Sequence, residues 1–244
     1  MIIIYGTRFY GRVEECGPSF LGTQFVHIWY LPLIPIGSHL VLGTNPDGTF
    51  RGIATGMSGR SVFAGYARVW GPVALVAAIL LLAMNLTEVN DISEALALVL
   101  GGGLAVGLAL AACVLGWFFV GRLSADAKQQ RAVYAQFSGA FVDPADMAQA
   151  RYPLREGLMH EIATRVQGLA GMGYRVPADP VNQWAQIALD PSVADERVVS
   201  AAFTLARVDG SLSQGAYKDW MNQAHAQLWQ KLRQMNPPYL RLPI

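Results

Sequence analysis

The sequence predicts a mainly α-helical membrane protein with a small N-terminal β-domain, a two-helix transmembrane hairpin and a C-terminal cytoplasmic helical bundle. Two long segments, at about 69–86 and 97–121, contain no charged residue. Residues 1–65 alternate short apolar runs with glycine and proline turns, which is typical of strands. Residues 123–235 instead carry apolar side chains at helical spacing, and a proline-containing tail, 236–244, is expected to be extended.

The two uncharged segments are long enough to cross a bilayer. A hydrocarbon core of about 30 Å requires roughly 20 apolar residues in a helix. In lipid only a helix satisfies the backbone of a single segment by itself. The alternative is a helical hairpin buried in a soluble core, but soluble helices of this length normally have a polar face. Residues 66–122 are therefore assigned to a transmembrane hairpin.

Basic residues flank this hairpin on one side only. Arg60 and Arg68 precede the first span and Arg122 follows the second, whereas the connecting loop is acidic and lacks Lys and Arg. The positive-inside rule then places both termini in the cytoplasm, with two spans in the plasma (inner) membrane. The side chains expected to anchor the hairpin at the membrane interface are Tyr66, Arg68, Trp70, Trp117 and Arg122.

Small residues recur along the second span. Gly103, Gly107 and Ala111 follow one another at intervals of four, and Ala74 and Ala78 offer a similar surface on the first span. This spacing allows helix backbones to approach closely in lipid. Two interpretations remain open: the seam packs the two spans of one chain together, or it binds a partner subunit.

The N-terminal residues predict a small β-domain. Strands are expected at 2–4, 9–13, 24–30, 39–42 and 50–54, with turns at Gly17-Pro18 and over 45–48. Pro32 and Pro35 are expected to exclude both a helix and a central strand over 31–37. Residues 58–68 are expected to lie at the headgroup level.

Residues 24–38, which include FVHIWYLPLIPIGS, resemble a stretch in small uncharacterised bacterial membrane-associated proteins. Some of those proteins hold this stretch between two CxxC knuckles of a zinc ribbon. This chain contains no CxxC, and a structural zinc site needs about four ligands. Cys16, His27 and His39 supply at most three, so neither a metal nor another cofactor is expected.

The C-terminal part predicts a small helical bundle. A polar helix is expected to continue from the second span over 123–137, and Asp143-Pro144 is a helix-start signal. Apolar stripes then predict a helix ending at 171–173, a helix opening at 179–180, a third stripe over 198–205 and a last helix from 213.

Three patterns in this part bear on chemistry. His160-Glu161 resembles the start of a zincin motif, but Thr164 occupies the position of the second histidine. Asp209-Gly210 lacks the regular ligands of a calcium loop and is expected to be a turn between helices. The pattern over 198–213 also resembles the helix–Asp-Gly–helix unit of tellurite-resistance TerB-like domains, which implies a helical interaction domain rather than an enzyme.

Two further surfaces are candidates for docking. Met221, His225 and Trp229 form either an exposed apolar patch on the last helix or the buried second edge of a central helix. The tail is apolar for a terminus and is expected to lie along a partner or along the bundle. Its candidate docking residues are Pro237, Pro238 and Tyr239.

The composition and the motifs limit the classes of function to be expected. A net charge of +1 over 244 residues gives no reason to expect a nucleic-acid partner, and the sequence contains no recognisable catalytic set. The expected function is that of a non-enzymatic accessory or scaffold subunit of a larger inner-membrane complex, in contact with the lipid bilayer and with protein partners. The alternative is a cytoplasmic metal- or ligand-dependent module, or an enzyme, anchored by the hairpin.

Overall fold

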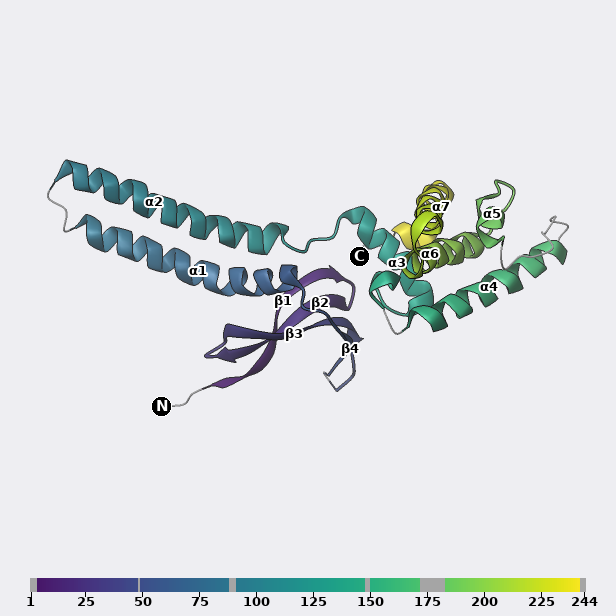
Figure 1. The fold of residues 1–244 in the computed structure, drawn as a ribbon, viewed down its shortest axis with the longest axis horizontal. Helices are drawn as coiled ribbons and strands as arrows, with labels where there is room; N and C mark the ends of the chain where they lie inside the picture. The colour runs from purple at the N-terminus through teal and green to yellow at the C-terminus, as the bar shows by residue number, and fades with distance from the viewer. Residues whose placement is uncertain (1–3, 48, 88–90, 148–149, 172–182, 242–244) are drawn as a thin grey trace. The chain divides into compact units, whose positions relative to one another are not determined.

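The computed structural model describes residues 4–47, 49–87, 91–147, 150–171 and 183–241. The chain divides into two compact units, Met1–Glu15 with Phe20–Leu123 and Cys16–Ser19 with Ser124–Ile244. The first unit contains a four-stranded sheet and two long helices, and the second contains the remaining helices (Figure 1). The mixture of one small sheet and mostly helix agrees with the predicted fold class.

The strands of the sheet follow one another in the order β1-β2-β3-β4. They are β1 (Tyr5–Cys16), β2 (Ser19–Ile28), β3 (Leu31–Thr44) and β4 (Phe50–Thr55). The predicted turn at Gly17-Pro18 joins β1 to β2, and the turn predicted over 45–48 joins β3 to β4, although Gly48 lies outside the described residues. The expected strand at 2–4 also falls largely outside them.

Pro32 and Pro35 lie in a strand, but not at a central position of the sheet, as predicted. β3 runs through Pro32 and Pro35, and β2 pairs with it from Leu31 onwards, whereas β4 pairs only with Ser38–Thr44. The prolines therefore lie in the half of β3 that has one neighbouring strand, where a missing N–H costs no ladder hydrogen bond on the open side. Two register shifts in this half make Leu33 and Ile36 extra, bulged residues.

The first long helix, α1 (Gly59–Leu86), begins well before the predicted span. Residues 59–68 form its first turns and pack against the sheet, and their expected position at the headgroup level stays a prediction. Ala64 is fully buried, and a Cβ at Gly65 would lie 2.9 Å from the ring of Phe25. The glycine thus allows the sheet to approach the helix closely.

A chain of buried hydroxyl groups joins three strands to the start of α1. Ser61 Oγ donates to the carbonyl of Gly11 at 2.7 Å, and Thr23 Oγ1 donates to Ser61 Oγ at 2.8 Å. Thr23 also bonds Ser38, whose Oγ accepts from the Ser58 N–H. Because these hydroxyls are almost completely buried and all have partners, the network stabilises the junction between sheet and helix.

The second long helix, α2 (Ile92–Val114), lies antiparallel to α1 and continues into a π-helical turn, Leu115–Phe119 (Figure 1). Both helices are long and apolar enough to cross a membrane. Only 6% of the most apolar window of α1 and 0% of that of α2 are buried. The hairpin is therefore not enclosed in a core formed by the described part of the chain.

The expected continuation of the second span into residues 123–137 is wrong. The π turn ends at Phe119, and Gly121 adopts a φ of +74°, in the left-handed region that glycine tolerates. A new helix, α3 (Ala125–Ser138), then starts with Ser124, whose hydroxyl caps the Ala127 N–H at 3.1 Å.

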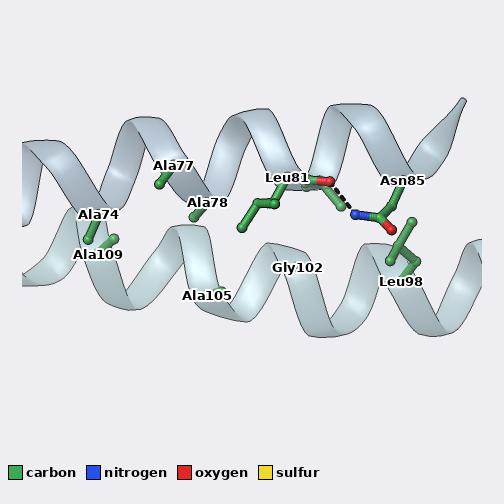
Figure 2. A pocket seen from close by; sticks show the side chains of 10 residues that line it. Ala74, Ala77, Ala78, Leu81, Asn85, Leu98, Gly102, Ala105 and Ala109 are labelled. Atoms are coloured by element: carbon green, nitrogen blue, oxygen red, sulfur yellow. Dashed lines mark hydrogen bonds between the residues drawn. The ribbon is translucent and has the colours of Figure 1, made fainter.

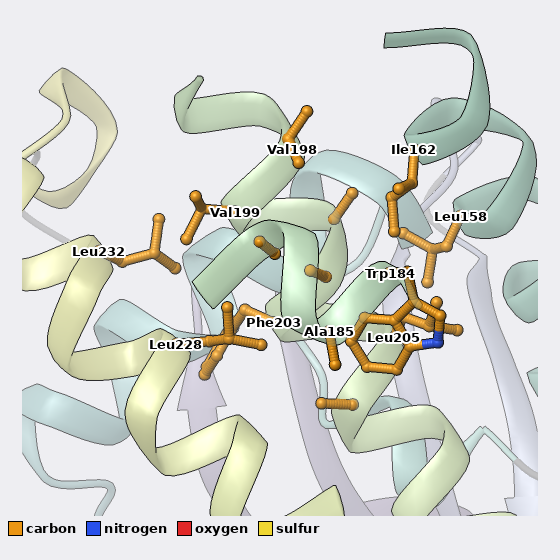
Figure 3. Close-up of a cluster of buried hydrophobic side chains, with 14 of the residues drawn as sticks. Leu158, Ile162, Trp184, Ala185, Val198, Val199, Phe203, Leu205, Leu228 and Leu232 are labelled. Carbon is orange, nitrogen blue, oxygen red and sulfur yellow. The ribbon is translucent and has the colours of Figure 1, made fainter. Parts of the chain in front are cut away.

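The second unit packs its helices around α6 (Glu196–Leu212), which contacts α3, α4 (Arg151–Gly171), α5 (Trp184–Leu189) and α7 (Gly215–Met235). Figure 3 shows side chains of α4, α5, α6 and α7 meeting in one core. The predicted stripes are buried there, among them Leu158, Ile162, Ala201 and Leu205. Asp143-Pro144 starts only a short 3-10 turn, Pro144–Asp146, and the predicted helix start at 179–180 lies outside the described residues.

The expected turn at Asp209-Gly210 is wrong, because α6 continues through both residues. Asp209 is only 3% exposed and accepts a 2.6 Å hydrogen bond from Arg155 Nε of α4. Gly210 faces α7, where an added Cβ would lie 3.4 Å from Met221 Cβ. Asp209 thus forms a buried ion pair with Arg155, and Gly210 allows α6 and α7 to pack closely.

Candidate functional site

The α1–α2 hairpin carries a groove between its two helices (Figure 2). Its volume is about 450 Å³, and it is lined mainly by small and aliphatic side chains. The lining residues are Ala74, Ala77, Ala78, Leu81, Leu82, Asn85, Leu98, Gly102, Ala105 and Ala109. The amide of Asn85, the one polar side chain among them, donates to the Leu81 carbonyl at 2.7 Å. The groove therefore offers dispersion contacts to an apolar group such as a helix or an acyl chain.

The glycines that bring α1 and α2 together are not the predicted ones. A Cβ at Gly102 would lie 2.5 Å from Leu82 Cδ1, and one at Gly71 would lie 3.0 Å from Cys113 Sγ. Gly116 similarly faces Ala67. These close approaches are what small residues permit between helices.

The predicted seam points elsewhere. A Cβ added at Gly103 or Gly107 would meet nothing within 4 Å, and Ala111 is exposed. Ala74 and Ala78 do line the groove, but opposite Gly102, Ala105 and Ala109 (Figure 2). The interpretation that Gly103, Gly107 and Ala111 pack the two helices of one chain together is therefore wrong, and their role in binding a partner stays a prediction.

Two predicted interface anchors have partners within the protein. The Tyr66 hydroxyl donates to the Leu33 carbonyl at 2.7 Å, and Trp70 Nε1 donates to the Pro32 carbonyl at 2.9 Å. Both acceptors lie in the bulged half of β3. The side chains of α1 thus hold the β2–β3 hairpin beside the helix, a role that the sequence pattern did not indicate.

Arg68 connects three elements. Its Nε donates to the Gly116 carbonyl at 2.7 Å, its Nη1 to the Arg12 carbonyl at 2.6 Å and its Nη2 to the Val120 carbonyl at 3.5 Å. The guanidinium therefore joins α1 to β1 and to the end of α2. We call Tyr66, Arg68 and Trp70 with these bonds the collar.

The other two predicted anchors, Trp117 and Arg122, remain exposed. Trp117 lies in the π turn beside Phe118 and Phe119, and all three residues are more than half exposed. Because Gly116 faces Ala67, these rings lie near the collar. The aromatic residues of both helices thus gather at one end of the apolar hairpin.

The predicted docking patch on the last helix is wrong, and the alternative of a buried edge is confirmed. Met221 is fully buried and Trp229 is 7% exposed. The His225 ring stacks on Phe203 at 4.3 Å, and its Nε2 lies 2.7 Å from the Tyr134 hydroxyl. Burial, with a smaller contribution from a nearby arginine, lowers the pKa of His225 to about 4, so the ring is neutral at pH 7.

The tail is not extended where the structure describes it. Pro238–Arg241 form a 3-10 turn, Pro237 is buried and Leu240 is 8% exposed. The Tyr239 hydroxyl bonds Ser200 of α6. Of the two expected positions, along a partner or along the bundle, residues 237–241 therefore occupy the second.

A polar hollow lies between α3 and α7, where Asp126, Gln129, Gln130, His225, Trp229 and Arg233 line it. The Asp126 carboxylate already accepts from Trp229 Nε1 at 3.0 Å and from Gln130 Nε2 at 3.1 Å. Among the described residues, no three His, Cys, Asp or Glu side chains come together as a metal site. His27 stacks on Tyr30, and His39 packs against the Phe9 ring.

No protein-family model matches this chain, and neither a curated protein sequence nor a solved structure matches it. The candidate site is therefore defined by its geometry alone. It consists of the groove, the outward face of Gly103 and Gly107 on α2, and the collar that ties the sheet to the hairpin.

Proposed function

We propose that this protein is a non-enzymatic accessory or scaffold subunit of a bacterial-type plasma (inner) membrane complex. It crosses the bilayer twice, with both termini in the cytoplasm. The observation that carries the proposal is the exposure of two apolar 28-residue segments, α1 and α2 with its π turn, whose most apolar windows are 6% and 0% buried. In water such a surface is strongly unfavourable, whereas in lipid it carries no penalty.

The distribution of charge supports the orientation. Arg60 and Arg68 lie at the sheet end of α1, and Arg122 follows α2, whereas Asp91 and Glu94 lie at the other end of the hairpin. Basic residues favour the cytoplasmic side of a membrane, and aromatic rings favour its interfaces. The exposed rings of the π turn lie at the basic end as well.

The partner is proposed to be a transmembrane helix of another subunit. The hairpin already packs through Gly71, Gly102 and Gly116, so its own fold does not require small residues at 103 and 107. An exposed face with glycine at these two positions allows another backbone to approach closely. The bundle forms the cytoplasmic part, and its core is filled by its own helices.

A second candidate function, a ligand-dependent cytoplasmic module, is favoured by one observation, the polar hollow between α3 and α7. Arg233, whose side chain is 63% exposed, is the lining group best suited to a small polar ligand, because the amides of Gln129 and Gln130 already donate to Leu240 and Asp126. Ligand binding at this hollow is expected to raise the melting temperature of the protein. Substitution of Arg233 by Met would remove that increase if the hollow is the binding site.

The first proposal is tested by extracting the tagged protein from its host membrane in mild detergent. Native electrophoresis and mass spectrometry then identify the proteins that migrate with it. We expect other proteins at fixed stoichiometry, and we expect Gly107→Leu to lose them. Gly101→Leu is the matched control, because a Cβ at Gly101 also meets nothing within 4 Å. Migration of the unmodified protein alone would contradict the proposal.

A further inference from the structure

The tip of the β2–β3 hairpin exposes an unusual number of apolar side chains. Their exposed fractions range from 39% at Leu33 to 62% at Ile34. No charged residue occurs between His27 and His39. We call this surface the apolar tip; it comprises Ile28, Trp29, Tyr30, Leu33, Ile34 and Ile36.

The turn of this hairpin holds two large rings in a strained conformation. Trp29 and Tyr30 have φ values of 52° and 65°, in the left-handed region, and Ile28 pairs with Leu31 on either side of them. Two-residue turns of this kind normally contain Asn or Gly, because bulky residues are unfavourable there. Strain of this sort gathers at functional sites. The turn keeps both rings about half exposed.

The surrounding contacts hold the turn in place. The Tyr10 hydroxyl donates to the Tyr30 carbonyl at 2.8 Å, and the Tyr30 ring stacks on His27 with centroids 5.7 Å apart. The Trp29 N–H donates to the carbonyl of Ile4 at 2.9 Å. The exposed rings are thus part of an ordered structure.

The collar fixes the position of the apolar tip along α1. Trp70 and Tyr66 bond the carbonyls of Pro32 and Leu33, so the tip lies beside the last turn before the apolar part of the helix. Immediately beyond Trp70, the exposed surface of α1 becomes apolar, with Val73 46% and Val76 57% exposed. The apolar tip is therefore continuous with the apolar surface of the hairpin.

From this continuity we infer that the apolar tip inserts into the headgroup region of the cytoplasmic leaflet, as a third membrane contact beside the two spans. The inference rests on the proposed membrane placement of α1 and α2. Trp and Tyr prefer the membrane interface, where their rings meet acyl chains and their polar atoms stay hydrated. Leu33 and Ile34 then leave water together with the spans, and the contact fixes how the sheet lies against the bilayer.

The test places an environment-sensitive fluorophore on single cysteines in the full-length chain, after Cys16→Ala and Cys113→Ala. The probe positions are Ile34→Cys in the apolar tip and Thr44→Cys at the other, exposed end of the same strand. Val76→Cys reports the span itself. The protein is placed in nanodiscs of phosphatidylcholine and phosphatidylglycerol, and quenching is measured with aqueous iodide and with lipids carrying a spin label near the headgroup.

We expect iodide to quench the Ile34→Cys label several-fold less than the Thr44→Cys label, and the spin-labelled lipid to quench it strongly. A shielded Val76→Cys label with an Ile34→Cys label as accessible as Thr44→Cys would overturn this inference and leave the membrane placement intact. An accessible Val76→Cys label would overturn both. An Ile34→Cys label shielded from both quenchers would show cover by protein, which also refutes insertion.

Discussion

Arg68 is expected to hold the sheet, α1 and the end of α2 together, and Arg68→Met tests this directly. Methionine keeps a linear apolar side chain but removes every donor. Two of the bonds lost, to Gly116 and Arg12, are 2.7 and 2.6 Å long, whereas the third, to Val120, is 3.5 Å long and weak. Hydrogen bonds from a charged group contribute about 1.5–3 kcal/mol each.

Water can replace part of this contribution, because the bond to Arg12 lies at an exposed position. We therefore expect Arg68→Met to lower the free energy of unfolding of the first unit by about 2–4 kcal/mol. In a unit of this size that corresponds to a fall in melting temperature of roughly 5–15 °C. Circular dichroism at the helix band, recorded during heating in mild detergent, measures it.

Arg60→Met is the matched control on the same helix. Arg60 is 78% exposed and pairs with Glu14 at 3.7 Å, so its loss is expected to cost under about 0.5 kcal/mol. Equal melting temperatures for Arg68→Met and Arg60→Met, whether unchanged or lowered to the same extent, would refute the role of Arg68 in the collar.

Three further outcomes are expected. Gly102→Leu should lower the melting temperature because its side chain would collide with Leu82. Gly103→Leu should not, because position 103 points away from α1. Equal melting temperatures for the two variants would refute the register between α1 and α2. Ser61→Ala should cost about 1–3 kcal/mol in denaturant unfolding, since it leaves buried partners of the hydroxyl chain unbonded. The low pKa of His225 should make unfolding easier as pH falls from 6.5 towards about 4, by up to about 3 kcal/mol, because only the unfolded state then takes up the proton. His225→Gln should flatten this pH dependence, and an unchanged pH profile would refute the assignment.

Apolar periodicity predicted much of the fold. The stripes of α4 and α6 are buried as predicted because a helix must place one face in a core, and spacing alone reveals that face. The same reasoning found two apolar helices of spanning length. Local turn chemistry located the turns before Ser19 and before Phe50, where proline and glycine limit the backbone.

Features that depend on distant residues were not predictable in this way. Gly101, Gly102 and Gly103 are adjacent, and neighbouring positions differ by about 100° around a helix, so size alone does not reveal which of them faces α1. Pro32 is tolerated because β4 ends its pairing at Ser38, which is a property of the sheet and not of the segment. Asp209 lies inside α6, and its partner, Arg155, comes from α4, more than 50 residues earlier in the sequence.

The collar shows the same limit. The positions of Arg68 and Trp70 beside an apolar stretch indicated lipid contact, but both side chains bond carbonyls of strands far away in the sequence. A backbone acceptor leaves no mark in the sequence, because every residue type provides one. The sequence therefore located the end of the hairpin but not the contacts made there.

The central claim, that the chain crosses the membrane twice with both termini in the cytoplasm, is tested most directly by labelling single cysteines with a membrane-impermeant maleimide. Glu94→Cys lies at the acidic end of the hairpin, Thr44→Cys in the sheet and Lys218→Cys on α7, and all three positions are exposed. In intact spheroplasts we expect only Glu94→Cys to be labelled, with the other two becoming reactive after lysis. Labelling of Thr44→Cys or Lys218→Cys before lysis, or protection of Glu94→Cys, would contradict the account.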